Sequence, residues 1–419
     1  KGLGGRGRSL CLEENGQQQP QQQIAGDREM AAMPLLSSRC SYLFLLLLLL
    51  PPGAHHVQAA GQGGVGINYG QIANNLPSPS QVAPLLQSLN IGRVKLYDAD
   101  PNVLGAFRNT NVEFVIAIGN GDVANMMDTN RARAWIVQNV QPFLPQTRIT
   151  CITVGNEVYS AGGDTALMSN LLPAMQSVHQ ALVALGLDGQ VNVTTAHSFA
   201  ILANSYPPSA GSFRADLAQY IQPLLNFHAQ IKSPFLINAY PFFAYKGDPG
   251  GVPLEYALFQ PNAGVTDPNT NLSYDNLLYA QMDSVYSAVK AMGLPDVDVS
   301  ISETGWPSMG DPDEVGATPE NAAAYNGNLL KRIAMKQGTP LRPSVPIDVY
   351  VFALFNENMK PGPTSERNYG LFYPNGSSVY NIGLQDQGYI RSNIYSSSSS
   401  GTTVFPGLGL LALLMAALM

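Results

Sequence analysis

The sequence predicts an α/β protein folded as a single (β/α)8 TIM barrel, and three observations favour this fold. From residue 64 onwards, short runs rich in Val, Ile and aromatic residues alternate eight times with longer helical patterns. The runs are apolar on both sides, as expected of strands buried in a parallel sheet. An open doubly wound sheet, the competing architecture, normally carries a glycine-rich phosphate turn after an early strand, and this chain has neither that turn nor a P-loop. A closed barrel would place its active face at the carboxyl ends of the strands.

The eight predicted strands are short and regularly spaced along the chain. In order they cover residues 65–70, 93–98, 112–119, 148–155, 191–196, 235–240, 297–302 and 347–355. Each is followed by a connection long enough for the helix that joins two parallel strands. The spacing therefore favours one barrel rather than several domains.

Helix-capping residues and apolar stripes predict the connecting helices. Ser80 can cap the first helix, whose apolar face carries a valine and three leucines between 82 and 89. In the fourth helix, apolar residues from Leu167 to Leu185 recur at intervals of three and four, which indicates one buried stripe. Thr318 can cap a helix near 318–336 that has Glu320 in its first turn. The other helices are expected near 102–109, 122–144, 213–231 and 275–292, and the pattern is weakest for a helix after the eighth strand.

The connection after the sixth strand is longer than the others. Residues 246–273 are polar and contain several Gly and Pro residues. Long connections in a compact domain are usually functional. We therefore expect this stretch to form a wall beside a cleft.

The N-terminal part of the chain does not resemble a folded domain. Residues 1–29 contain a Gln-rich tract that cannot supply a packed core, and we interpret them as a segment upstream of a start at Met30 or Met33. Residues 30–60 have the order of a secretory signal peptide: a basic start, an apolar run too short to span a bilayer, and small residues suited to cleavage. The folded domain is then expected to cover residues 61–395.

Residues 396–419 form a Ser-rich spacer followed by an apolar tail. This pattern is typical of a glycosylphosphatidylinositol attachment signal, in which a lipid replaces the tail. A tail-anchor helix and a cleaved vacuolar sorting extension are the alternatives. We expect a secreted protein at the outer face of the plasma membrane and in the cell wall, with the vacuole as the alternative and with membrane contact only through the lipid.

The charge and the metal-binding residue types restrict the partners. Without residues 1–60 the chain keeps 17 basic and 25 acidic residues, which argues against a nucleic-acid partner and suits a neutral polymer. Cys151 is then the only cysteine, and its apolar run suggests an inert buried thiol. His179, His197 and His228 are far apart and lack zinc-like spacing, so each is expected to be a surface or structural residue. We expect a monomer with no metal and no cofactor.

Polar and aromatic residues follow most of the predicted strands. They are Asn68 and Tyr69 after the first strand, Tyr97 and Asp98 after the second, Asn156 and Glu157 after the fourth, Tyr240, Phe242 and Phe243 after the sixth, Glu303 and Trp306 after the seventh, and residues 356–358 after the eighth. The carboxylates Glu157 and Glu303 would meet at the mouth of a barrel. Glycoside hydrolysis needs one carboxyl that gives a proton to the leaving oxygen, a second that attacks or activates water, and aromatic surfaces that hold sugar rings. Taken alone, Glu303 could equally be an exposed acid that closes a strand.

Four motifs resemble the plant members of glycoside hydrolase family 17, the endo-β-1,3-glucanases. They are Gly66-Ile67-Asn68-Tyr69-Gly70, Val154-Gly155-Asn156-Glu157, Ser302-Glu303-Thr304-Gly305-Trp306-Pro307-Ser308 and Phe352-Ala353-Leu354-Phe355-Asn356-Glu357-Asn358. The resemblance implies a retaining double displacement on β-1,3-glucan, with Glu157 as general acid/base and Glu303 as nucleophile. Retention requires carboxyl groups about 5–5.5 Å apart, and the acid needs a pKa raised by burial and by its negative neighbour. Asn156 would bond the sugar 2-hydroxyl by the same resemblance.

Further residues match positions that line the cleft of this family. Glu357, Lys360 and Glu366 do so, and Lys360 could keep nearby carboxylates ionised; the alternative is a surface ion-pair network that holds the last loop. Tyr97 and Tyr240 are interpreted as sugar platforms or hydrogen-bond donors, or alternatively as packed aromatics of the rim. The remaining predicted substrate-binding residues are Asn68, Tyr69, Phe243 and Trp306, with Trp306 as a wall of the sugar site.

The implied function is an endo-acting hydrolase of β-1,3-glucans such as callose. A non-catalytic glucan-binding wall protein on the same barrel is an alternative, because a fold does not guarantee a function. A glucan-transferring enzyme with the same covalent intermediate, or a mixed-linkage glucanase, is another. The presence of both Glu157 and Glu303 speaks against the pure binder. Longer relatives add a cysteine-rich carbohydrate-binding module, whereas this chain has no cysteine after Cys151.

Overall fold

The computed structural model describes residues 65–160 and 163–382. Most of the predicted domain 61–395 lies within these residues. The predicted upstream segment 1–29, signal peptide 30–60 and tail 396–419 lie outside them, so the expectations of secretion and of a lipid anchor stay predictions. None of the helices in the described part is long and apolar enough to cross a membrane.

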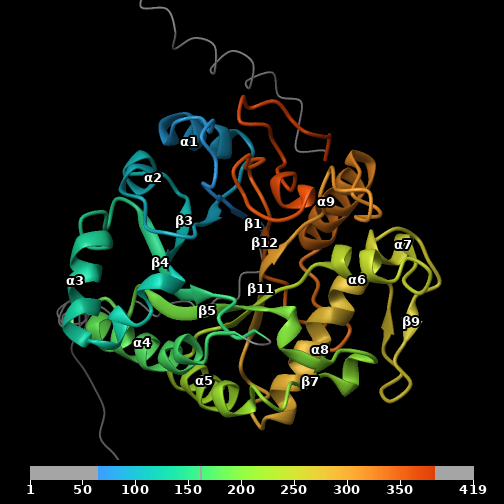
Figure 1. Ribbon diagram of the computed structural model, residues 1–419, viewed down its shortest axis with the longest axis horizontal. Coiled ribbons are helices and arrows are strands. Elements are labelled where there is room, and N and C mark those ends of the chain that lie inside the picture. The colour runs from blue at the N-terminus through green and yellow to red at the C-terminus, as the bar shows by residue number, and fades with distance from the viewer. Residues whose placement is uncertain (1–64, 161–162, 383–419) are drawn as a thin grey trace, which may run out of the picture. The chain divides into compact units, whose positions relative to one another are not determined.

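Eight parallel strands close into a barrel, which confirms the predicted (β/α)8 fold (Figure 1). The strands are β1 (Val65–Asn68), β2 (Arg93–Lys95), β3 (Glu113–Ile118), β4 (Arg148–Asn156), β5 (Asn192–Ser198), β8 (Phe235–Asn238), β11 (Val299–Thr304) and β12 (Val349–Val351). Around the barrel their order is β1-β12-β11-β8-β5-β4-β3-β2. Because all strands run in the same direction, all their carboxyl ends lie at one end of the barrel.

The helices surround this barrel in Figure 1. They include α1 (Pro79–Ser88), α2 (Pro101–Ala106), α3 (Thr129–Asn139), α4 (Thr165–Ala184), α5 (Ala218–Ile231), α8 (Leu277–Ala291) and α9 (Pro319–Ala334). The predicted cap of α9 is confirmed, since the Thr318 side chain accepts a hydrogen bond from the Asn321 amide. The predicted cap of α1 was wrong by two residues. Ser78 precedes the helix, and its amide donates to Gln81 Oε1 at 3.0 Å, so that Ser80 already lies inside the first turn.

Two other expectations for helices also need correction. The predicted helix 122–144 is broken into the 3₁₀ turns η1 (Asn120–Asp122) and η2 (Asn125–Met127) followed by α3, because Asp128 caps a new helix start by accepting from the amides of Asn130 and Arg131. After β12, the described residues up to 382 hold only the 3₁₀ turn η5 (Thr364–Arg367). The sequence Pro361-Gly362-Pro363 explains this, since two prolines and a glycine oppose an α-helix.

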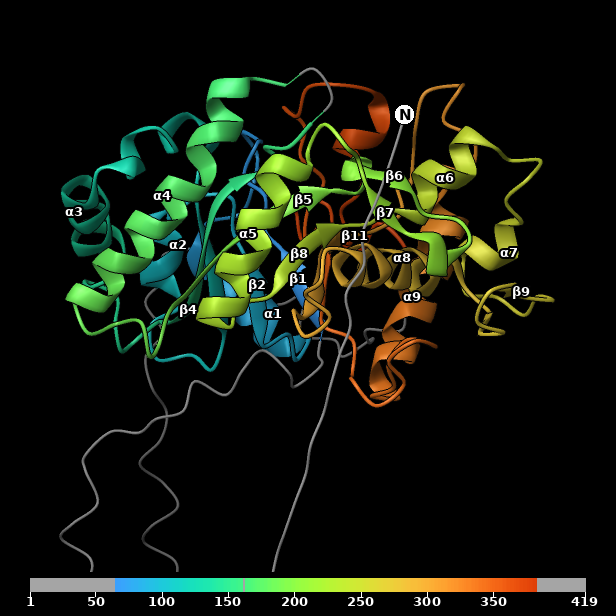
Figure 2. The same cartoon turned by 90° about the horizontal axis from the view of Figure 1, so that it is seen from below.

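Two insertions enlarge one side of the barrel. The hairpin of β6 (Leu202–Asn204) and β7 (Ser212–Phe213) follows β5, with the 3₁₀ turn η4 (Pro208–Ala210) inside it. After β8 come α6 (Pro241–Gly247), α7 (Leu254–Ala257) and the hairpin of β9 (Val265–Thr266) and β10 (Ser273–Tyr274). Figure 2 shows α6, α7 and β9 grouped at one side. The predicted wall 246–273 is therefore real, and several of its residues line a cleft.

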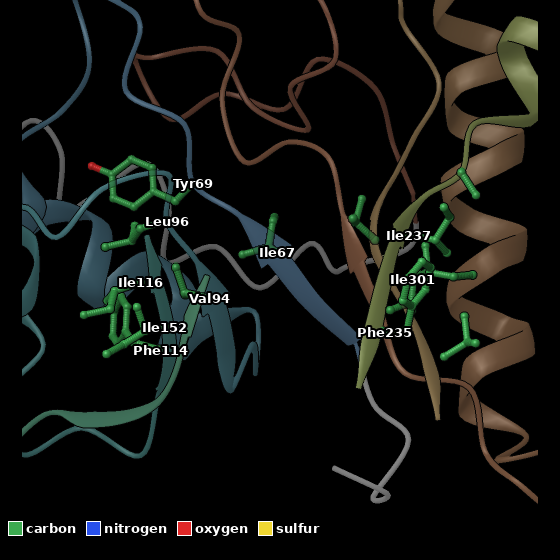
Figure 3. Packing of buried hydrophobic residues seen from close by; sticks show 14 of the residues in the cluster. Ile67, Tyr69, Val94, Leu96, Phe114, Ile116, Ile152, Phe235, Ile237 and Ile301 are labelled. Carbon is green, nitrogen blue, oxygen red and sulfur yellow. The ribbon is translucent and has the colours of Figure 1, made fainter. Parts of the chain in front are cut away.

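The core consists of branched and aromatic side chains of the strands and of the helices packed on them. Buried Ile, Val and Phe residues of six strands are labelled in Figure 3: Ile67, Val94, Phe114, Ile116, Ile152, Phe235, Ile237 and Ile301. Close packing of this kind keeps the strand ends in fixed positions. The residues that follow the strands are thus held on a rigid frame.

His197 on β5 is a fully buried histidine in this core. Its ring stacks on Tyr159 at a centroid distance of 5.5 Å and on Phe235 at 4.4 Å, and neither ring nitrogen has a hydrogen-bond partner among the described residues. Burial, followed by the neighbouring His228, lowers the pKa of His197 to about 3. Its structural role agrees with the sequence-based expectation.

We expect His197→Phe to reduce the sensitivity of the fold to acid. The folded protein keeps His197 neutral, while the unfolded chain binds a proton below the ordinary pKa near 6.5, so the wild type loses stability as pH falls through that value. Each pH unit costs up to about 1.4 kcal/mol, down to the folded-state pKa of about 3. Denaturant unfolding at pH 7 and pH 5 measures the difference, and the variant should lose less stability between the two. An equal loss in both proteins would contradict the assignment; His179→Phe, at a partly buried histidine, is the control.

Candidate active site

A cleft of about 1390 Å³ lies at the carboxyl ends of the strands. Glu157, directly after β4, and Glu303, near the end of β11, both line it. The predicted meeting of these two carboxylates at the barrel mouth is therefore confirmed. The other predicted substrate-binding residues in the lining are Tyr97, Asn156, Tyr240, Phe243, Glu357, Lys360 and Glu366.

Glu303 is buried and held at both oxygens. Its Oε1 accepts hydrogen bonds from Lys95 Nζ at 3.0 Å and from the Tyr97 hydroxyl at 2.7 Å, and its Oε2 accepts from the Tyr240 hydroxyl at 3.0 Å. The pairing of β11 with both neighbouring strands shifts register after Ile301, and such irregularities re-aim side chains next to active sites. Three donors, one of them a cation, suit an ionised carboxylate with a fixed orientation.

Glu157 has a different environment. It is exposed to the cleft, and its Oε1 accepts a hydrogen bond from Asn238 Nδ2 at 2.9 Å. The side chain is open to the cleft, and protein atoms of the cleft walls replace part of the water around it. Burial is the largest cause that raises the pKa of Glu157, and the negative charge of Glu303 adds to it; the Asn238 hydrogen bond and Lys95 act in the opposite direction. Glu157 is thus the carboxyl of the pair that holds a proton more readily than an ordinary glutamate does.

The backbone at Glu157 is unusual and explains the motif that precedes it. Glu157 has a positive φ of 52°, and its amide donates to the Ala196 carbonyl at 2.8 Å. Gly155 has φ of +68°, and a Cβ there would lie 2.7 Å from Val158 Cγ2. A glycine is therefore required two residues before the acid. A non-glycine residue in the left-handed region is typical of a functional site held by its surroundings.

Two residues that contact the carboxylates were missed by the sequence-based prediction. Lys95 is 1% exposed and lies 4.4 Å from the centroid of the Tyr97 ring in addition to contacting Glu303. Asn238 binds Glu157 and also accepts a hydrogen bond from Ser302 Oγ. The lysine had a detectable signal, because a lysine inside an apolar strand is almost never buried without a partner. Asn238 had only its place near the end of the sixth strand.

Glu357, Lys360 and Glu366 lie together on one wall of the cleft. Glu357 is buried and accepts a hydrogen bond from the Ile72 amide at 2.8 Å, and burial raises its pKa. Lys360 Nζ lies 3.1 Å from Glu366 Oε2. Both sequence-based interpretations therefore hold in part, since the ion pair exists and its members also line the cleft.

Three predicted substrate-binding residues do not reach the cleft. Trp306 is fully buried, and its Nε1 donates to the Gly316 carbonyl at 2.7 Å while Phe242 packs edge-on against the ring, so it cannot stack on a sugar. Tyr69 is buried as well, because its amide still pairs with the Lys95 carbonyl and the chain reaches the cleft only at Gly70.

Asn68 is the third of them, and it supports the site from below. Its Nδ2 donates to the Ser302 carbonyl at 3.1 Å, which ties β1 to the strand that carries Glu303. Asn68 is fully buried and absent from the cleft lining. The corrections for Asn68 and Tyr69 share one cause: a residue close to a strand end still belongs to the barrel wall if its backbone remains paired.

The described residues hold no group of three or more His, Cys, Asp or Glu side chains that could bind a metal ion. Cys151 on β4 has a pKa raised to about 12 by burial, so its thiol is not a nucleophile at neutral pH. The polar side chains that line the cleft among the described residues carry carboxylates, amides, phenols, the hydroxyls of Ser198 and Ser205, and the ammonium group of Lys360. Buried Lys95 contacts Glu303 from outside this lining.

Comparisons with known proteins agree with this geometry. The sequence profile described as Glycosyl hydrolases family 17 matches residues 65–384. Glucan endo-1,3-beta-glucosidase 14 of Arabidopsis thaliana is 62% identical over 361 residues, which cover 86% of this chain and 91% of the relative. Among solved structures, a beta-1,3-glucanase and allergen of Cryptomeria japonica pollen has a TM-score of 0.73 at 39% identity and covers 76% of this chain and 98% of its own. A structure from a study of two plant beta-glucan endohydrolases with distinct substrate specificities has a TM-score of 0.70 at 38% identity, covering 76% and 99%.

Proposed function

The chain belongs to glycosyl hydrolases family 17, and from this premise we propose that it cleaves internal β-1,3 bonds of glucans with retention of configuration. It is a glycoside hydrolase of the glucan endo-1,3-beta-glucosidase class. The carrying observation is the contrast between its two cleft carboxylates. Glu303 is bound by a cation and two phenols, whereas Glu157 has a raised pKa. Two carboxyls in such different environments suit the separate roles of nucleophile and acid.

In the first step Glu303 acts as the nucleophile. A carboxylate oxygen of Glu303 attacks the anomeric carbon of the glucosyl unit, and the bond from that carbon to the glycosidic oxygen breaks. Glu157 gives its proton to this oxygen, so that the departing glucan leaves as an alcohol. The products are a glucosyl ester of Glu303 and an ionised Glu157.

In the second step Glu157 acts as a base. It takes a proton from a water molecule whose oxygen attacks the anomeric carbon, and the ester bond to Glu303 breaks. Two inversions at one carbon give net retention. The step restores the ionised Glu303 and the protonated Glu157 for another cycle.

Incubation with laminarin, lichenan and cellulose tests this proposal. We expect laminarin to be cut into short oligosaccharides of mixed length, because an open cleft admits internal bonds, and proton NMR at early times should show the β-anomer first. Release of only monosaccharide would argue against endo action. An α-anomer as first product would exclude the double displacement. No product from any of the three polymers would overturn the proposal.

The raised pKa of Glu157 predicts the alkaline side of the activity profile. Activity needs protonated Glu157, so kcat/KM on laminarin should fall as pH rises through a pKa above that of an ordinary glutamate. The same shift means that the stability contribution of protonated Glu157 is complete below the unfolded pKa and is lost as pH rises through the folded pKa. The measurement is kcat/KM across pH for the wild type and for Glu157→Ala with an aryl glucan whose leaving group needs no proton.

In Glu157→Ala, kcat/KM should no longer fall on the alkaline side of the pH profile. Glu320→Gln, at an exposed acid in the first turn of α9, should keep this alkaline limb. An unchanged limb in Glu157→Ala would assign the titration to another group. An alkaline limb at the ordinary glutamate pKa in the wild type would contradict the raised pKa of Glu157.

A further inference from the structure

The cleft extends past the catalytic carboxylates into a side chamber. We use this name for the space lined by Tyr206, Pro208, Val252, Tyr256, Tyr274 and Gln281. Its walls are the β6–β7 hairpin, α7, the β9–β10 hairpin and the N-terminal half of α8. The two hairpins and α7 each contact α8 directly. Figure 2 shows them on the side of the barrel that carries the insertions. The chamber is thus part of the same cavity as Glu157 and Glu303, but neither glutamate belongs to its walls.

The walls of the side chamber are mainly aromatic and aliphatic. Tyr256 and Tyr274 are 6% and 2% exposed, and Tyr206 is 69% exposed. All three rings line the same cavity. Faces and edges of tyrosine rings provide large contact area for a flat apolar group.

A buried polar atom of a residue that lines the chamber has no partner in the described part of the chain. Gln281 is 6% exposed, and its Oε1 accepts no hydrogen bond within the described residues. A buried acceptor left unpaired costs about 1–3 kcal/mol, and such groups in folded proteins call for an explanation. The terminal torsion of glutamine is broad, so a small rotation can present this oxygen to the chamber. A ligand that donates one hydrogen bond would satisfy it.

We propose that the side chamber binds a neutral phenol, whose ring lies against the tyrosines and whose hydroxyl donates to Gln281 Oε1. A bare glucose unit fits less well, because each of its several hydroxyls needs a partner and the chamber wall is mostly apolar. Asp248 also lines the cavity and disfavours an anionic ligand. Because the chamber opens into the cleft, the phenol can be free or attached to a carbohydrate. This inference goes beyond hydrolysis and does not depend on it.

Calorimetric titration of the whole protein with two ligands tests the proposal. Methyl 4-hydroxycinnamate carries the donor, and methyl cinnamate lacks it but has the same ring and no charge. We expect the hydroxylated ligand to bind roughly five- to tenfold tighter, the value of one neutral hydrogen bond that satisfies a buried group. Gln281→Leu should bring this ratio close to one, whereas Gln219→Leu, at an exposed glutamine of α5, should leave it unchanged.

Two more variants locate the ligand. Val265→Trp fills the chamber from the short strand β9 and should abolish binding of both compounds. Glu303→Gln changes the catalytic carboxylate and should leave both affinities as they are. Equal affinities of the two ligands for the wild type, no binding of either, or binding that is lost in Glu303→Gln and kept in Val265→Trp would each overturn the proposal. Since no turnover is measured, these results are independent of the proposed hydrolysis.

Discussion

Glu303→Ala is expected to lower kcat/KM on laminarin by at least about 10⁴-fold, the scale of loss when a catalytic nucleophile is removed. Glu357 is engaged by the Ile72 amide and Glu157 is held by Asn238, so neither of these two glutamates is free to take its place. The barrel should remain folded with reduced stability, because alanine leaves the buried ammonium group of Lys95 without its ion-pair partner. The measurement is the initial rate of reducing-end formation, with the melting temperature as a check of folding. Activity within about tenfold of wild type would exclude Glu303 as nucleophile.

Azide separates the roles of the two carboxylates. In Glu303→Ala, azide can attack the anomeric carbon of an aryl glucan in place of the carboxylate, which gives one inversion and an α-glucosyl azide. In Glu157→Ala, the ester with Glu303 still forms from a substrate with a good leaving group, and azide then opens it to give a β-glucosyl azide. The opposite pair of products would reverse the two assignments. Glu357→Gln serves as a control at another carboxylate of the cleft, which is buried as Glu303 is, and should give no azide product.

The sequence predicted the barrel strands and the carboxylates at their ends better than the helix starts and the side chains that contact those carboxylates. Eight strands and the carboxylates at their ends follow from local periodicity and from the rule that parallel strands expose their carboxyl ends together. Glu157 and Glu303 could therefore be placed at one cleft before any coordinates. Ser80 and the helix 122–144 show the limit of such local signals, because a capping side chain two or six residues away selects a different helix start.

Trp306 and Lys95 show why the rest could not be predicted. Both lie within a few residues of a strand end, and only long-range packing decides which side chain faces the cleft. Trp306 turns into a layer behind the cleft and packs on Phe242 and Tyr325. Lys95 turns towards Glu303, a residue 208 positions later in the chain. Contacts of this kind depend on strand register, which the sequence of one segment does not contain.

Lys95→Met should reduce kcat on laminarin by roughly 10²–10³-fold and lower the free energy of unfolding by about 3–5 kcal/mol, the cost of leaving one partner of a buried ion pair uncompensated. Lys95 is 1% exposed and gives Glu303 Oε1 its only cationic contact within the described residues. Methionine matches the length of the lysine stem, so the change removes the charge and the donor rather than volume. A positioning residue should affect kcat more than KM, because it orients the nucleophile and does not line the cleft.

Lys246→Met separates positioning from stability. It removes a lysine that contacts buried Glu314 at 3.1 Å outside the cleft, and Glu314 keeps the amides of Asp311 and Ser365 as donors. We expect this variant to lose stability with kcat nearly unchanged, and Lys95→Arg to recover part of the activity through its charge. If both Lys95→Met and Lys246→Met lost stability and both kept the kcat of the wild type, Lys95 would have only a structural role. A loss of kcat confined to Lys95→Met would show that Lys95 on β2 orients the nucleophile Glu303 on β11. These two strands are separated in the barrel by β1 and β12.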